Sequence, residues 1–189
     1  MKRHLNVSSI QLMLPPYDIF PELSSDNILL RQILSEDINN IVEISFYNAK
    51  AAASSEEGLE MLDKINNDYN DGRTVHWGIV DTQTNIIVGS CGYYRGFENH
   101  TGELGCVLKS EFSGKGYMTS AMKLAIDFGF STIGLKKILA ITTKQNIKAV
   151  KLIERLGFVK TTELEGDKVE FDLRVLQNGK DQILNNQSF

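Results

Sequence analysis

The feature that most constrains the fold is a change of hydrophobic period near the middle of the chain. Over residues 73–109, short runs of alternating or β-branched residues are separated by turn residues, which is typical of β-hairpins. After residue 110, apolar residues recur at helical spacing on both sides of one β-branched run. The predicted elements are strands over 73–81, 85–96 and 101–109, a helix over 117–133, a strand over 136–144 and a helix over 146–157. A meander that passes into such segments predicts a mixed sheet with helices on both faces.

The flanking segments complete one domain. They predict a strand over 27–33, helices over 35–48 and 54–70 that both begin at serine N-caps, and a strand pair within 158–176. The 136–144 strand is apolar throughout, so we expect it to be buried on both faces. The full order is β-α-α-β-β-β-α-β-α-β-β, an α/β (mixed α+β) fold with about seven strands. We expect an irregular extension over 1–26, the domain over 27–177 and a weakly structured tail over 178–189.

The composition limits the partners of the protein. The formal net charge is −4, so the totals show no strongly basic face for nucleic acid. No run approaches the ~20 apolar residues that a membrane span needs. The chain has 2 cysteines, Cys91 and Cys106, and both lie in strand-like runs, where we expect buried, reduced thiols. We therefore expect a cytoplasmic protein with no direct nucleic-acid or membrane partner.

A loop with two glycines, "EFSGKGYMTS" at 111–120, precedes the central helix. It is not a P-loop, because Gly116 follows Lys115 where that motif needs Ser or Thr. It is not a dinucleotide fingerprint either, because position 119 is threonine. Glycine at 114 and 116 lets the backbone approach an anion, and the N–H groups of the loop and of the helix start point the same way. By itself the stretch fits either an ordinary turn or an anion cradle.

Two motifs in sequence give a more specific indication. "SGKGYMTSA" at 113–121 and "NIKAVKLIERLGF" at 146–158 resemble the cofactor-binding elements of the GCN5-related N-acetyltransferase (GNAT) superfamily. Gly116 matches the Q/R-x-x-G-x-G/A pattern of that family, whereas Ser113 and Met118 depart from it. "FPELSSDNILLRQI" and "GELGCVLKSEFSGKGY" are similar to its ribosomal-protein N-acetyltransferase branch. The resemblance spans about residues 20–176.

The resemblance implies a GNAT-like twisted mixed sheet that binds acetyl-CoA as a co-substrate, without a metal. The fourth and fifth strands of such a sheet splay apart, and the pantetheine arm of acetyl-CoA fills the opening. The cofactor-binding residues that it implies are Cys106, Val107 and Leu108 on the fourth strand, Ser113, Gly114, Lys115, Gly116, Tyr117, Met118 and Thr119 around the loop, and Asn146 at the next helix start. Dimers are common in the superfamily, so the resemblance leaves a homodimer open.

Acetyl transfer to an amine requires the neutral amine, so a base must take its proton. The resemblance implies Glu103 on the fourth strand as this catalytic base. Weaker alternatives are His76, Asp81, Tyr94 and His100.

The departing thiolate raises a separate question. Many members of the superfamily protonate it with a tyrosine or a serine of the last helix, but the corresponding positions here are Ile153 and Ala149. Water, another side chain such as Tyr117, or unaided release of the thiolate would take over this role.

We therefore expect an N-acetyltransferase that acts on a primary amine, of a protein N-terminus or a small molecule, by direct attack in a ternary complex. The acceptor pocket is expected between the helices over 35–48 and 54–70 and the turn near 165–168. Two alternatives are a non-catalytic acyl-CoA-binding module of the same fold and an α/β interaction domain with a coincidental glycine turn.

Overall fold

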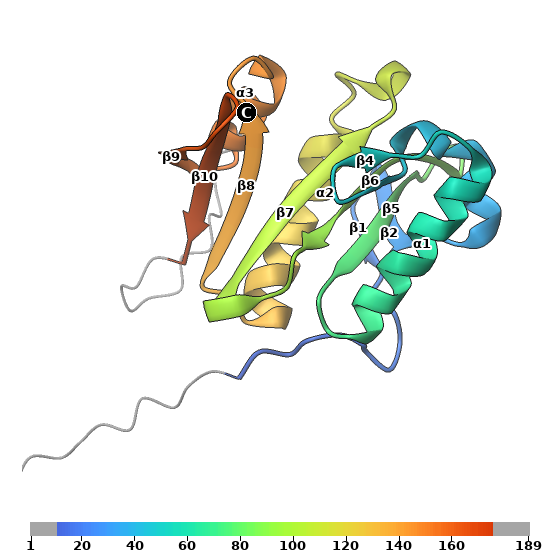
Figure 1. Cartoon of the computed structure of the whole chain (residues 1–189), viewed down its shortest axis with the longest axis horizontal. Coiled ribbons are helices and arrows are strands. Elements are labelled where there is room, and N and C mark those ends of the chain that lie inside the picture. Colours follow the sequence, from blue (N-terminus) through green and yellow to red (C-terminus); the bar gives the residue numbers. More distant parts are fainter. Residues whose placement is uncertain (1–10, 176–189) are drawn as a thin grey trace, which may run out of the picture.

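The computed structural model describes residues 11–175, which are organised around one mixed sheet. This sheet has 8 strands in the order β1-β2-β5-β6-β7-β8-β10-β9, and β3 and β4 form a separate hairpin (Figure 1). The strands are β1 (Leu23–Ser24), β2 (Ile28–Gln32), β3 (Phe46–Tyr47), β4 (Lys50–Ala51), β5 (Val75–Asp81), β6 (Ile86–Tyr94), β7 (Thr101–Leu108), β8 (Lys137–Thr143), β9 (Val159–Glu163) and β10 (Lys168–Arg174). The seven strands predicted along the chain are all present in this sheet, and β1, β3 and β4 are additional strands.

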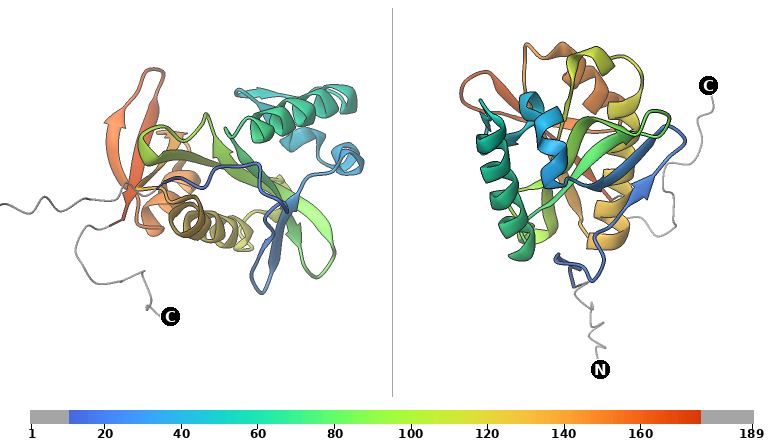
Figure 2. Two further views of the ribbon diagram at one scale, coloured as in Figure 1. Left: turned by 90° about the horizontal axis from the view of Figure 1, so that it is seen from below. Right: turned by 90° about the vertical axis from the view of Figure 1, so that its right-hand side faces the viewer.

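Helices cover both faces of the sheet, as predicted. α1 (Ser55–Asn70) lies on one face, and α2 (Tyr117–Phe128) and α3 (Ile147–Arg155) lie on the other (Figure 2). The shorter turns are the 3₁₀ helices η1 (Ser35–Asn40), η2 (Val42–Ile44), η3 (Glu98–His100) and η4 (Ser110–Phe112), and the π-helical η5 (Gly129–Ile133) that extends α2. Each face has its own hydrophobic cluster, the larger one under α2 and α3.

Part of the segment before residue 27 belongs to the packed structure. β1 pairs with β2, and the indole Nε1 of Trp77 donates a hydrogen bond to the Pro21 carbonyl at 2.8 Å. Tyr17 and Phe20 pack against the larger cluster. This stretch is therefore more ordered than the predicted irregular extension. Residues 1–10 and the predicted tail at 178–189 lie outside the described residues.

The helix predicted over 35–48 is wrong. Two 3₁₀ helices and the β3–β4 hairpin replace it. The buried residues Ile38, Ile41 and Ile44 are three positions apart, which matches the three residues per turn of a 3₁₀ helix better than an α-helix. The N-cap is Leu34 rather than a serine, and its N–H donates to the carboxylate of Asp37 at 2.8 Å.

The helix predicted over 54–70 is confirmed, but it buries a different face from the one that its apolar spacing predicts. Ser54 is the N-cap and accepts a hydrogen bond from the Glu57 N–H at 3.2 Å. Helical spacing predicts a buried stripe of Leu59, Leu62, Ile65 and Tyr69. The buried residues of α1 are instead Gly58, Met61 and Leu62, and Leu59 is 39% exposed. α1 turns this face toward η1 because Gly58 packs directly against Ile38, with no room for a Cβ between them.

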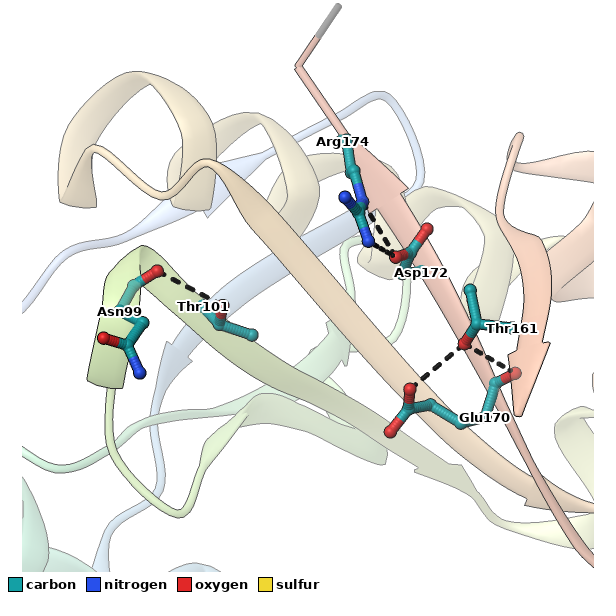
Figure 3. A network of polar contacts seen from close by, with 6 residues as sticks. All are labelled: Asn99, Thr101, Thr161, Glu170, Asp172 and Arg174. Carbon is teal, nitrogen blue, oxygen red and sulfur yellow. Dashed lines mark hydrogen bonds and ion pairs between the residues drawn. The ribbon is translucent and has the colours of Figure 1, made fainter. Parts of the chain in front are cut away.

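β8 is less buried than its apolar sequence predicts. Ile138 and Ala140 are buried, but the alternate residues of the strand are only partly covered. β10 pairs with β8 along its whole length, and local polar contacts fix the β9–β10 hairpin (Figure 3). Arg174 donates to the buried carboxylate of Asp172 at 2.6 and 2.9 Å. The hairpin thus pairs with one edge of β8 along its whole length, whereas β7 pairs with the other edge only over Lys137–Leu139.

Candidate active site

β7 and β8 form the parallel pair of the described sheet, and they separate part-way along their length. Their pairing runs from Thr101–Lys137 to Glu103–Leu139, although β7 continues to Leu108 and β8 to Thr143. Figure 1 shows the two strands diverging toward their carboxyl ends. We call this opening, between residues 104–108 and 140–143, the fork. It lies where the resemblance predicts the fourth and fifth strands to splay.

The open edge of β7 presents the backbone groups of alternate residues. The N–H of Lys109 donates to Val88 on β6 at 2.9 Å, and the β6–β7 register continues without a shift to Glu103. Since hydrogen-bonded and non-hydrogen-bonded pairs alternate along an antiparallel ladder, Val107 directs its backbone groups to β6. Cys106 and Leu108 direct theirs to the fork. Two of the three β7 residues predicted to bind the cofactor therefore offer backbone groups there.

The loop after β7 has free backbone donors at the start of α2. The first hydrogen bond of the helix runs from Ser120 N–H to Gly116 O at 3.1 Å. Within residues 11–175, no hydrogen bond uses the N–H groups of residues 114–119. These donors lie at the positive end of the helix dipole, an arrangement that binds anions. The loop predicted as an anion cradle has the required backbone geometry.

Gly114 and Gly116 serve the conformation of this loop. Their φ angles are +82° and +85°, a region that residues with a Cβ rarely adopt. A Cβ at either position would meet nothing within 4 Å, so the space beside both glycines is open to a ligand. We call the loop and helix start over 113–119 the cradle.

Charged side chains flank the cradle. The ammonium of Lys115 lies 4.9 Å from the centroid of the Phe112 ring. Arg155 of α3 donates to the hydroxyl of Thr119 at 3.0 Å and so places a guanidinium at the helix start. Arg155 was not among the predicted site residues, because a basic residue in the last turn of a helix usually only complements the helix dipole.

Asn146 is the N-cap of α3. Its side-chain oxygen accepts a hydrogen bond from Ala149 N–H at 3.2 Å, which accounts for its sequence position without a ligand. Its amide NH₂ group has no partner among the described residues. Farther along α3, Ile153 is buried, so neither Ala149 nor Ile153, the two positions where the resemblance predicts a general acid, can supply a proton.

A cavity of about 510 Å³ lies beside the fork on the α1 face of the sheet. Its walls come from the β3–β4 hairpin, α1 and the strands β5, β6 and β7. The functional side chains around it are Tyr47, Asp68, Arg73, His76, Ser90, Tyr94, Arg95 and Glu103. We call it the acceptor pocket. The turn near 165–168, expected to contribute, does not line it, because that hairpin lies beyond β8.

Glu103 is placed where the pocket meets the fork. It lines the pocket, and it is the last residue of β7 that pairs with β8. Its Oε1 accepts a hydrogen bond from Arg95 of the facing strand. The pair leaves the second carboxylate oxygen, Oε2, without a partner among the described residues.

The other candidate bases are less well placed. Asp81 lies in the β5–β6 turn, where hydrogen bonds from Thr84 and from the Gln83 N–H lower its pKa. His100 lies before β7, with Nδ1 3.4 Å from the Gly134 carbonyl. Tyr94 lines the pocket, but burial raises its pKa.

His76 also lines the pocket. Burial lowers its pKa from 6.5 to about 4, so its imidazole resists protonation and makes a weak base.

Two arginines at the pocket rim, Arg73 and Arg95, form ion pairs that were not predicted. Arg73 contacts Asp68 at 2.7 Å and Asp71 at 2.8 Å, and the hydroxyl of Tyr47 donates to Asp68 at 3.0 Å. Arg73 precedes β5 and Arg95 follows β6, and the two strand ends are paired through Val75 and Tyr93. Basic residues at strand ends are a weak signal by themselves, and only the strand pairing brings these two together.

The comparison with protein families agrees with this arrangement. The model of the family described as "Acetyltransferase (GNAT) domain" matches residues 27–159. The chain belongs to the GNAT family. Members are acyltransferase enzymes that bind acetyl-CoA as a co-substrate and an amine as acceptor, so this GNAT protein is an N-acetyltransferase rather than an interaction domain.

Curated relatives carry the same activity in their names. The uncharacterized N-acetyltransferase YoaA of Bacillus subtilis is 27% identical over 150 residues, which cover 75% of this chain and 85% of the relative. The spermidine N(1)-acetyltransferase of Escherichia coli is 40% identical over 62 residues, 33% of each chain.

Solved structures share the fold. The ribosomal-protein-S5-alanine acetyltransferase of Vibrio fischeri superposes with a TM-score of 0.67 at 23% identity, covering 82% of this chain and 96% of the other. The dodecameric spermidine N-acetyltransferase of Vibrio cholerae gives a TM-score of 0.65 at 20% identity, covering 79% and 95%.

Among residues 11–175, no helix is long and apolar enough to cross a membrane. No group of three or more His, Cys, Asp or Glu side chains in this range is arranged to hold a metal ion.

Proposed function

We propose that the protein transfers the acetyl group of acetyl-CoA to a primary amine by direct attack in a ternary complex. The single observation that carries this proposal is the position of β7. One edge of this strand opens into the fork, and one of its faces forms a wall of the acceptor pocket. A thioester bound along the edge and an amine bound in the pocket would meet at β7, and holding two reactants in contact supplies much of the rate.

Acetyl-CoA binding is assigned to the fork and the cradle. The N–H groups of residues 114–119 and the guanidinium of Arg155 would bind the pyrophosphate. The pantetheine amides would pair with the backbone of Cys106 and Leu108, and Asn146 could donate its free amide hydrogens. Ser113 and Met118, which depart from the family pattern, leave these backbone donors in place.

Glu103 is assigned as the base. An alkyl ammonium has a pKa near 10.4 and an α-ammonium near 8, so most acceptor amines carry a proton at pH 7. Oε2 of Glu103 can take this proton directly or through a water molecule. The neutral nitrogen then attacks the thioester carbonyl, a C–N bond forms, and the C–S bond breaks.

The leaving thiolate needs no dedicated acid. A thiol has a pKa near 8.5, so thiolate is a tolerable leaving group, and Ile153 and Ala149 supply no proton. A free backbone N–H of β7 would stabilise the negative charge that develops on the carbonyl oxygen. Two protons leave the nitrogen, one before the attack and one when the C–S bond breaks. One of them can reach the thiolate through water, and Glu103 passes the other to solvent, which balances the reaction.

The acceptor pocket distinguishes two kinds of amine. Relatives are named for spermidine and for a ribosomal protein. A polycation would require uncompensated carboxylates, but Asp68 and Glu103 are each paired with an arginine. The pocket therefore favours an acceptor with a single amine, such as the end of a peptide or a small monoamine.

The test is an activity screen with acetyl-CoA and a panel of monoamines, polyamines and peptides, followed by release of free thiol. We expect turnover on at least one monoamine or peptide. Tight CoA binding without turnover on any amine would contradict the proposed reaction, and absence of CoA binding would contradict the assignment of the fork and cradle.

A further inference from the structure

The floor of the acceptor pocket is shaped by two glycines in register with His76. His76 of β5 pairs with Gly92 of β6, and Gly92 pairs with Gly105 of β7. A Cβ at Gly92 would lie 2.9 Å from Cδ2 of His76, and one at Gly105 would lie 2.9 Å from the ring of Tyr94. The two rings therefore occupy the space that the glycines leave, with centroids 5.4 Å apart and planes tilted by 56° to each other.

The imidazole of His76 has unused hydrogen-bonding groups at this position. Nδ1 and Nε2 are both shielded from solvent, and neither has a partner among residues 11–175. His76 is the only residue of this range whose buried side-chain nitrogen or oxygen atoms lack a partner. Leaving a buried polar group unpaired is energetically unfavourable, and such groups are rare in folded proteins, so each one calls for an explanation.

The chemistry of this ring limits what it can bind. A neutral imidazole has one N–H donor and one acceptor nitrogen, and burial keeps His76 neutral, with a pKa of about 4. An ammonium group can only donate, so it would satisfy one nitrogen and leave the ring N–H unpaired. A neutral hydroxyl or amide can accept from the ring N–H.

The charged side chains that line the pocket are paired with one another, so His76, with its unpaired ring nitrogens, offers free hydrogen-bonding groups to the acceptor. Asp68 is paired with Arg73 and Glu103 with Arg95. These ion pairs lie at the rim, whereas His76 lies on the floor.

The geometry points to His76 as a specificity residue that recognises a neutral oxygen of the acceptor, a hydroxyl or an amide carbonyl, close to the amine that is acetylated. The inference rests on the proposed function, because it assigns the amine to the same pocket. It adds a substrate class that the reaction alone does not require, namely a monoamine with a neutral polar group rather than a plain alkylamine or a polyamine.

The test compares three primary amines of similar length: an amino alcohol, an amino-acid amide and an alkylamine. For the wild type we expect kcat/KM at least tenfold higher for one or both polar amines than for the alkylamine, in line with the cost of an unpaired buried donor. The two polar amines distinguish a hydroxyl from a carbonyl. In His76→Leu this preference should fall to about twofold or less, while the KM for acetyl-CoA stays the same, because His76 lies outside the fork and the cradle.

His76→Gln retains a donor and an acceptor and should keep part of the preference. His100→Gln is the matched control, because His100 lies outside the pocket, and it should keep all of it. A preference that survives in His76→Leu, or a wild type that prefers the alkylamine or spermidine, would overturn the inference while leaving the acetyltransferase reaction intact.

A measurement without turnover separates this inference from the proposed reaction. ¹⁵N NMR of the His76 ring can be followed in the CoA-bound protein as each amine is added. We expect the ring signals to shift with a polar amine and to shift much less with the alkylamine. Unchanged ring signals with the amino alcohol and the amino amide would refute the role of His76, whatever the outcome of the activity screen.

Discussion

At the scale of single residues, Glu103 carries the most specific chemical role. Replacing it with glutamine keeps the shape of the side chain and removes the base, so kcat should fall about 100-fold or more. The KM for acetyl-CoA should stay unchanged, because Glu103 faces the acceptor pocket. Steady-state kinetics check this.

Glu98→Gln is the control for that substitution, since Glu98 is exposed and lies in η3. Wild-type turnover in Glu103→Gln would remove this carboxylate as the base, and another group on the pocket wall would have to be sought.

The buried imidazole of His76 predicts a pH dependence of stability. The pKa of His76 is about 4 in the folded protein and near 6.5 in an unfolded chain. Between these values the unfolded state binds more protons, so the contribution is fully present above pH ~6.5 and is lost as the pH falls toward 4. It amounts to at most about 3 kcal/mol.

Urea unfolding at pH 7 and pH 4.5 measures this effect. His76→Phe should lose less stability than the wild type over that interval, whatever its stability at pH 7, and His100→Gln should behave like the wild type. Equal losses in His76→Phe and the wild type would show that His76 is not buried in its neutral form.

At the scale of elements, the start of α2 should keep more of its CoA affinity with a neutral side chain at Gly116 than with an anionic one of similar size. Gly116→Glu and Gly116→Gln both place a side chain at φ +85°, so both pay the same backbone strain. Only glutamate places an anion where we assign the pyrophosphate. We expect it to weaken CoA binding at least tenfold more than glutamine does, as measured by calorimetry. Equal affinities would place the phosphate elsewhere.

The cap of α3 can be separated from a ligand contact at the same residue. Asn146→Ala should cost about 1 kcal/mol of unfolding free energy, because it removes the acceptor for Ala149 N–H. Asn146→Asp keeps that acceptor and should restore the stability. A raised KM for acetyl-CoA in both variants would support a contact from the amide hydrogens, and a KM unchanged in both would leave Asn146 as a cap only.

The elements also show where local sequence is insufficient. Apolar spacing predicted the long strands and α1, α2 and α3, because each is long enough for its apolar residues to define a period. Apolar spacing failed over 35–48, because a pattern as short as Ile38, Ile41 and Ile44 does not distinguish an α-helix from a 3₁₀ helix. Contacts with α1 and the sheet select the tighter helix there.

At the scale of the whole molecule, acetyl-CoA should connect two parts of the sheet. β7 and β8 share pairing only from Thr101 to Glu103, so a ligand that fills the fork adds contacts that the free protein lacks. CoA at 100 times its Kd should raise the free energy of unfolding by about 2.7 kcal/mol. Gly116→Glu should show little of this gain at the same concentration. Thermal or urea unfolding with and without CoA makes the comparison.

The sequence by itself determined the order of the strands and main helices, the glycine loop before α2, the cap at Asn146 and the motifs that led to the GNAT family. These are local properties, set by hydrophobic period, φ preference and capping within a few residues. The tertiary structure decided what depends on pairing between distant segments: the end of the β7–β8 ladder after Glu103, the two arginine–carboxylate pairs at the pocket rim, and the alignment of Gly92 and Gly105 with His76. Strand register sets these contacts, and register is fixed only when the whole sheet packs against its helices.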